Sequence, residues 1–81
     1  MLKKFFERFS SKHIAEVLFV EICDYEEKLI ESYEGYVIGF GLMRLNRLAN
    51  KVEECMNGNK NISLIKAQKE FDTIKGIYPV D

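Results

Sequence analysis

The stretch SYEGYVIGFGLMRL, residues 32–45, decides how the rest of this chain is interpreted. It is apolar and aromatic, and three glycines interrupt it: Gly35, Gly39 and Gly41. Four interpretations compete for it. They are a turn between two helices, a β-strand, a membrane insertion, and a helix whose glycines let another helix approach closely.

Two of these interpretations are weaker than the others. A strand over residues 36–43 has no evident partner strand, although short apolar runs imitate both element types and the strand therefore stays as an alternative. The longest uncharged run, residues 35–43, is about half of the ~20 residues that a transmembrane helix requires. We therefore predict a turn followed by a helix.

Gly35 is the expected position of the turn, because glycine adopts positive φ without steric cost and commonly ends helices. A regular apolar repeat begins at Ile38, so the helix should open at Tyr36. Gly39 and Gly41 then fall in its first turns. A helical glycine costs about 1 kcal/mol relative to alanine, so both glycines indicate close approach by a neighbour.

Apolar residues recur at three- and four-residue spacing along the chain, which is typical of amphipathic helices. The first long stripe is Ile14, Leu18, Ile22, Tyr25, Leu29 and Tyr33, widened by Val17. The second follows heptad spacing and is flanked by Leu48 and Cys55: Ile38, Leu42, Leu45, Ala49, Val52 and Met56. The third is Leu64, Ala67, Phe71, Ile74 and Tyr78.

Breaking residues separate the stripes. MNGNKN, residues 56–61, contains glycine and asparagine, which end helices, and Asn61 or Ser63 can cap the next one. Helices are therefore predicted at residues 2–9, 11–34, 36–57 and 63–76. The predicted fold is all-α, a small antiparallel bundle of three main helices plus a short N-terminal amphipathic helix, in a single domain over residues 1–81.

The two cysteines, Cys23 and Cys55, are too few for a disulfide framework. With a turn at Gly35 they lie twelve and twenty residues from it, which offsets them by about 12 Å along an antiparallel hairpin. We predict two reduced, core-facing thiols in a cytoplasmic protein. The N-terminus lacks the apolar core of a secretory signal, since charged residues return at once.

No catalytic or cofactor signature stands out. His13 and Glu16 lie one helical turn apart, but a single histidine does not make a common metal site. No serine or cysteine has a nucleophile context, and GYVIGFG lacks GxGxxG spacing. We therefore predict that the protein is not an enzyme and that it binds no metal and no cofactor.

Charge is arranged in blocks. Glu27, Glu31 and Glu34 share an acidic helix face, and Arg44, Arg47 and Lys51 form a basic strip. The two blocks could lie side by side in one fold or face a partner, and the net charge of −1 favours the first arrangement. It also argues against nucleic-acid binding through the strip.

The N-terminal segment MLKKFFERF places Phe5, Phe6 and Phe9 on one helical face, with basic side chains opposite. Such a segment fits an amphipathic helix at a membrane surface. It also fits a short helix that closes one end of the bundle, which is favoured because so small a core needs the apolar area.

These features lead to a functional hypothesis. We expect a small cytoplasmic, non-enzymatic protein that binds another protein as a regulator, adaptor or inhibitor, with a Lys-, Ile- and Asn-rich composition of bacterial or phage type. Apolar residues beyond the heptad set, such as Val37 and Phe40, further predict a homodimer. The candidate partner-binding residues are Phe5, Phe6, Phe9, Glu27, Glu31, Glu34, Tyr36, Phe40, Arg44 and Arg47.

Overall fold

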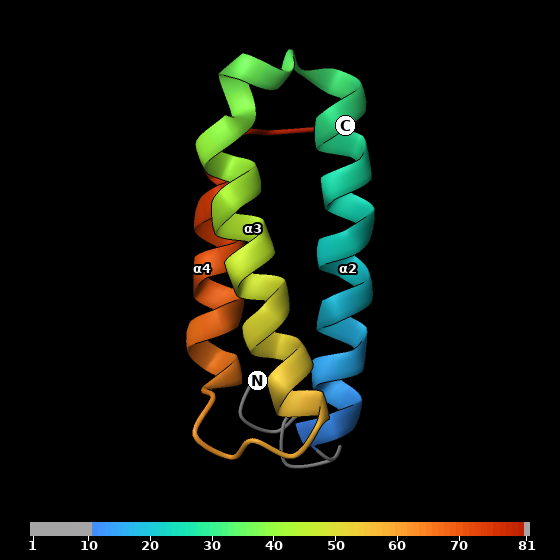
Figure 1. The fold of residues 1–81 in the computed structure, drawn as a ribbon, viewed down its shortest axis with the longest axis vertical. Helices are drawn as coiled ribbons and strands as arrows, with labels where there is room; N and C mark the ends of the chain where they lie inside the picture. The colour runs from blue at the N-terminus through green and yellow to red at the C-terminus, as the bar shows by residue number, and fades with distance from the viewer. Residues whose placement is uncertain (1–10, 81) are drawn as a thin grey trace.

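The computed structural model describes residues 11–80 of the chain, and in this part it contains three helices and no strand. They are α2 (Ser11–Ser32), α3 (Gly35–Met56) and α4 (Leu64–Ile77). Successive helices run antiparallel (Figure 1), and each contacts the other two. The predicted all-α bundle of three main helices is confirmed. The helix predicted at residues 2–9 lies outside the described residues.

The turn between α2 and α3 falls one residue earlier than predicted. Glu34 is extended, with φ −68° and ψ 141°, and Gly35 is the first residue of α3. The carbonyl of Glu34 accepts a hydrogen bond from the N–H of Val37 at 3.0 Å. The prediction that Gly35 is the hinge is therefore wrong: an extended residue reverses the chain here, so no positive φ is needed.

Positive φ is used instead at the other turn. Gly58, two residues after the end of α3, has φ 100° and is the only glycine with positive φ among residues 11–80. Its N–H donates to the carbonyl of Cys55 at 3.1 Å. Ser63 then caps α4, because its Oγ accepts from the N–H of Lys66 at 3.3 Å. The break predicted at MNGNKN is confirmed, and Ser63 is the capping residue.

The core lies between the helices and is made of apolar side chains from all three. Burial of one such side chain stabilises a fold by roughly 1.5–3 kcal/mol. The largest fully buried ones are Phe71, Ile22, Leu29, Ile38, Leu45, Leu48, Ile74 and Val52.

Two details of the predicted core are corrected. On α3, Leu42 and Ala49 are only half-buried, whereas Leu48 and Cys55 are buried. α3 packs against α4 as well as α2, so its buried face is turned toward α4 relative to the seam of a two-helix coil. On α2, Val17 is 43% exposed and does not widen the stripe.

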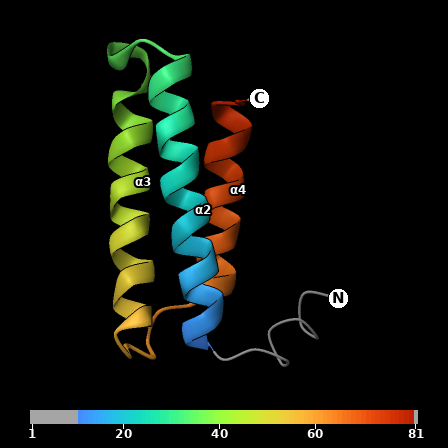
Figure 2. The ribbon, with the colours of Figure 1, turned by 90° about the vertical axis from the view of Figure 1, so that its right-hand side faces the viewer.

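Tyrosines hold the end of α4 beside the other two helices. The Tyr25 hydroxyl donates to the carbonyl of Tyr78 at 2.5 Å, and the Tyr33 hydroxyl donates to that of Pro79 at 2.7 Å. The Tyr33 and Tyr78 rings meet edge to face, 6.0 Å between centroids. Because successive helices run antiparallel, the end of α4 and the start of α3 lie at the same end of the bundle (Figure 2).

Candidate interaction surface

The first turns of α3 carry two aromatic side chains that are almost fully exposed. Tyr36 is 88% exposed and Phe40 is 82% exposed, and Met43, one turn further on, is 55% exposed. Their four- and three-residue spacing places them on one helical face. Ile38 and Leu45, at 1% and 0%, mark the buried face of the same helix. The aromatic face therefore points away from the core.

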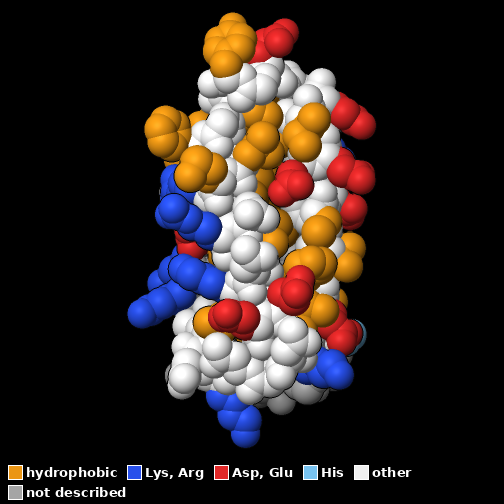
Figure 3. Space-filling view, in the orientation of Figure 1, with side chains coloured by type: hydrophobic (Ala, Val, Ile, Leu, Met, Phe, Trp, Pro, Cys, Tyr) orange, Lys and Arg blue, Asp and Glu red, His pale blue; other side chains and the backbone are white. Residues whose placement is uncertain are grey.

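Other apolar side chains extend this surface. Val37 is 46% exposed, and we call Tyr36, Val37, Phe40 and Met43 the α3 patch. Ile30 near the end of α2 and Ile77 at the end of α4 are 55% and 53% exposed at the same end of the bundle. Figure 3 shows hydrophobic side chains around the start of α3, and others further down along α2. Contiguous exposure of this kind is typical of interaction sites.

Charged side chains border the patch on both sides. Along α3 the patch is followed by Arg44, which is half-buried, and by the exposed Arg47. Figure 3 shows Lys and Arg along the α3 edge and most Asp and Glu toward α2. The acidic face of α2 is exposed and consists of Glu27, Glu31 and Glu34, the last of which stands in the turn.

The two charged blocks stand on adjacent helices, α2 and α3, but no ion pair joins them within residues 11–80. The ion pair that the structure contains within residues 11–80 joins Lys75 Nζ to Asp72 Oδ1 at 3.4 Å, both on α4. The charges of both blocks consequently remain available to a partner.

The structure brings together part of the predicted site. Tyr36 and Phe40 are adjacent on the exposed face of α3, and Arg44 and Arg47 continue it. Phe5, Phe6 and Phe9 lie outside the described residues. Reasoning from sequence missed Met43, Ile30 and Ile77 as surface residues. The sequence did indicate their exposure, because none of the three belongs to an apolar stripe.

The glycines of α3 differ in their surroundings. A Cβ at Gly41 would stand 2.7 Å from Cε2 of Tyr78, so the close approach predicted there comes from the chain itself. A Cβ at Gly35 or Gly39 would meet nothing within 4 Å. At Gly39 the predicted close neighbour is absent from residues 11–80.

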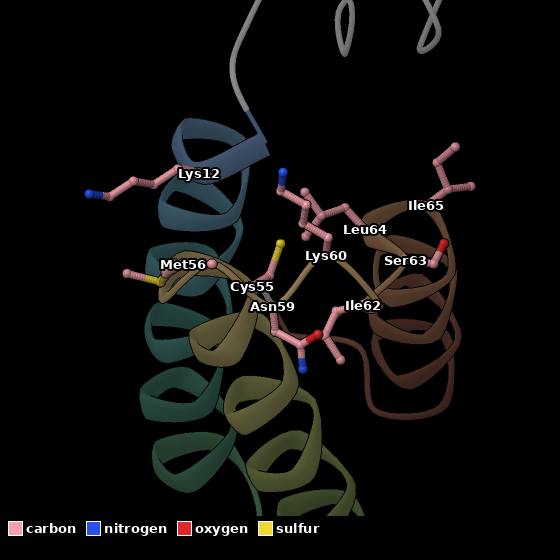
Figure 4. Close-up of a pocket in the computed structure, with 10 residues that line it drawn as sticks. Lys12, Cys55, Met56, Asn59, Lys60, Ile62, Ser63, Leu64 and Ile65 are labelled. Carbon is pink, nitrogen blue, oxygen red and sulfur yellow. The ribbon is translucent and has the colours of Figure 1, made fainter.

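A pocket of about 570 Å³ opens at the other end of the bundle, where α2 begins, α3 ends and α4 begins (Figure 4). The Cys55 sulfur points toward the side chains of Lys60 and Leu64, while Lys12 extends outward from α2. The residues lining this end pocket are Lys12, Cys55, Met56, Gly58, Asn59, Lys60, Ile62, Ser63, Leu64 and Ile65.

The end pocket is largely apolar. Cys55 and Leu64 are 9% and 8% exposed, and Ile62 is half-buried. Ile65 is 52% exposed at its margin. Buried core residues thus form part of the wall of this pocket.

The two cysteines occupy different environments, and both thiols are free. Cys55 is buried as predicted, but Cys23 is exposed, which corrects the prediction that both face the core. The pKa of Cys23 is raised above its ordinary value, first by partial desolvation and then by nearby carboxylates. These carboxylates belong to Glu26, Asp24 and Glu27.

Comparison of the chain with protein-family models, curated proteins and solved structures gave no match. Within residues 11–80, no three His, Cys, Asp or Glu side chains gather where they could hold a metal ion. None of the three described helices combines the length and apolar character needed to cross a bilayer. The α3 patch and the end pocket are the two features from which function can be argued.

Proposed function

We propose that this protein is a small, non-enzymatic protein–protein interaction module whose docking surface is the α3 patch. The observation that supports this proposal is the exposure of Tyr36 and Phe40, 88% and 82%, on one face of a packed helix. Aromatic side chains are the most frequent anchors of protein interfaces. By binding through these side chains, the module acts as a regulator, adaptor or inhibitor of its partner.

The energetics favour a covered patch. An aromatic side chain can bury about 150–250 Å² of surface, so Tyr36 and Phe40 alone supply a large part of the ~800 Å² that each side of a standard interface buries. Val37 and Met43 add to this area, since both are about half exposed. A helix supports the patch, so little conformational freedom is lost on binding.

The first partner that we propose is a second copy of this chain. The patch is apolar, the residues that follow it are basic, and the neighbouring face of α2 is acidic. A two-fold axis along the bundle, with the α2–α3 faces of two copies opposed, places α3 of one copy opposite α2 of the other. Arg44 and Arg47 would then approach carboxylates such as Glu27 in the other copy, and every contact would occur twice.

Light scattering over a series of protein concentrations tests the dimer. We expect a particle larger than 9.5 kDa at tens of micromolar for the unmodified chain, and a monomer for Phe40→Ser. Ile65→Ser is the matched control, because Ile65 is a 52% exposed apolar residue at the start of α4, at the end of the bundle opposite the patch. If Phe40→Ser and the control associate equally, the patch is not the dimer interface.

A different partner protein is distinguished by affinity purification from the native host with mass spectrometry. The unmodified chain, Phe40→Ser and Ile65→Ser serve as parallel baits. A protein retained by the first and third baits but lost from the second binds through the patch. Retention of the same proteins by all three would refute the proposed docking surface.

A further inference from the structure

We propose that the end pocket is the binding site for the apolar face of this chain's own residues 1–9. The pocket lies where the chain enters α2, and Lys12, the second residue of that helix, is part of its lining. This inference is independent of the α3 patch, which lies at the opposite end of the bundle.

Reach supports this occupant. Lys12 is three positions after Phe9, so at most about 10 Å of chain joins them. A helix over residues 2–9 would measure about 12 Å, so all of its apolar side chains remain near the pocket. A tether this short gives an effective concentration of about a millimolar or more, without an external partner.

Reach also separates this site from the α3 patch. α2 has 22 residues and is therefore about 33 Å long. The patch lies at the far end of α2, beyond the reach of a helical segment that ends at residue 10. The N-terminal apolar face is therefore matched with the end pocket and not with Tyr36 and Phe40.

The chemistry of the two surfaces is complementary. The pocket presents apolar groups from Cys55, Met56, Ile62, Leu64 and Ile65. Phenyl rings suit such a lining, since methionine sulfur makes favourable contacts with aromatic rings.

Charge is compatible with this orientation. The basic residues of the segment, Lys3, Lys4 and Arg8, share the helical face opposite the phenylalanines. They would remain in water and away from the two lysines of the lining, Lys12 and Lys60.

Cys55 provides a direct readout, because it lies in the pocket while Cys23 lies on the exposed side of α2. We would label the native full-length chain with iodoacetamide and follow each cysteine by peptide mass spectrometry. The variant Phe5→Ala/Phe6→Ala/Phe9→Ala should label at Cys55 roughly tenfold faster or more, which corresponds to about 1.4 kcal/mol of docking free energy. The rate at Cys23 should not change.

A second pair of variants changes the pocket and not the segment. Ile65 and Ile77 are both isoleucines of α4 with nearly equal exposure, 52% and 53%, but only Ile65 lines the pocket. Ile65→Gln should accelerate labelling of Cys55, whereas Ile77→Gln should not. Because both side chains are on the surface, neither change prevents folding, and circular dichroism verifies this for each variant.

The triple variant Lys3→Gln/Lys4→Gln/Arg8→Gln controls for charge and should leave the Cys55 rate unchanged. Equal Cys55 rates in the unmodified chain, the phenylalanine variant and Ile65→Gln would overturn the inference. Protection of Cys55 that increases with protein concentration would assign the pocket to the N-terminus of a second copy, and would overturn the intramolecular assignment.

Discussion

The ring of Tyr78 lies so close to Gly41 that a Cβ at position 41 would stand 2.7 Å from Cε2 and 3.1 Å from Cδ2 of the ring. Gly41 is buried in the second turn of α3, where glycine costs about 1 kcal/mol relative to alanine. The space that this glycine leaves free is filled by the last tyrosine of the bundle. Gly41 therefore serves the packing of α4 on α3.

Replacing Gly41 tests this relationship. Gly41→Ala should lower the free energy of unfolding, because overpacking costs about 1–3 kcal/mol and the gain in helix propensity offsets about 1 kcal/mol of it. Gly39→Ala, two residues away with nothing within 4 Å, should instead raise it by up to about 1 kcal/mol. Urea titration followed by far-UV circular dichroism measures both. Equal stabilisation by the two changes would contradict the packing of Tyr78 on Gly41.

Two isoleucines of α2 test the position of the core. Ile22 is 0% exposed and Ile30 is 55% exposed. Ile22→Ala should cost about 2–5 kcal/mol, since it removes buried apolar contacts and leaves a cavity. Ile30→Ala should change the stability by less than about 0.5 kcal/mol. Thermal and urea unfolding measure both variants, and similar losses in the two would show that the core is misplaced.

Tyr25 links stability to its hydroxyl group. The hydroxyl donates to the Tyr78 carbonyl, and the Ile74 carbonyl lies at 3.4 Å. The ring meets Phe71 edge to face at 5.6 Å. Tyr25→Phe keeps the ring and removes the donor, so it should cost about 1 kcal/mol at neutral pH. Tyr36→Phe, at an exposed position, is the control and should be close to neutral in the unfolding assay.

The same hydroxyl predicts a pH dependence. The pKa of Tyr25 is raised above its ordinary value of 10.0, chiefly because burial disfavours the phenolate and secondarily because of Tyr33 and Tyr78. The folded state holds the proton more tightly than the unfolded state, so this stabilisation is complete below the unfolded pKa and is lost as the pH rises through the folded pKa. Unfolding free energies measured from pH 8 upward should fall less steeply in Tyr25→Phe than in the unmodified chain.

The turn after α3 makes a further prediction. Gly58 has φ 100°, and an L-residue forced into such a conformation loses about 1–2 kcal/mol. Gly58→Ala should therefore destabilise the protein by about this amount. Gly76→Ala, within α4 and with nothing within 4 Å, should stabilise it by up to about 1 kcal/mol. A stability gain in both variants, measured by urea unfolding, would place the turn elsewhere.

Periodicity was sufficient to predict α2, α3 and α4. The apolar stripes of the segments that form α2 and α4 identified Ile22, Leu29, Phe71 and Ile74 as core residues, because each helix buries a single face and the three- to four-residue repeat reports that face directly. The MNGNKN break was predicted from residue type instead, since glycine and asparagine favour turns.

The failures arise where tertiary contacts decide. α3 touches both other helices, so its buried face includes Gly41 and Leu48, a rotation that no heptad pattern encodes. Gly35 resembled a hinge because glycine permits positive φ, but Glu34 reverses the chain in an ordinary extended conformation. Net charge favoured charged blocks that lie side by side, but it contains no information about whether individual side chains pair between α2 and α3.

The placement of the tyrosines gives this protein built-in optical reporters. The chain has four tyrosines and no tryptophan, so its near-ultraviolet signal arises mainly from tyrosine. Tyr25, Tyr33 and Tyr78 contact the end of α4, whereas Tyr36 stands in solvent on the α3 patch. Near-ultraviolet circular dichroism therefore reports the docking of α4 through the signal of these three packed tyrosines. Iodide quenching of tyrosine emission, compared between the unmodified chain and Tyr36→Phe, reports whether the patch is covered, without any attached dye.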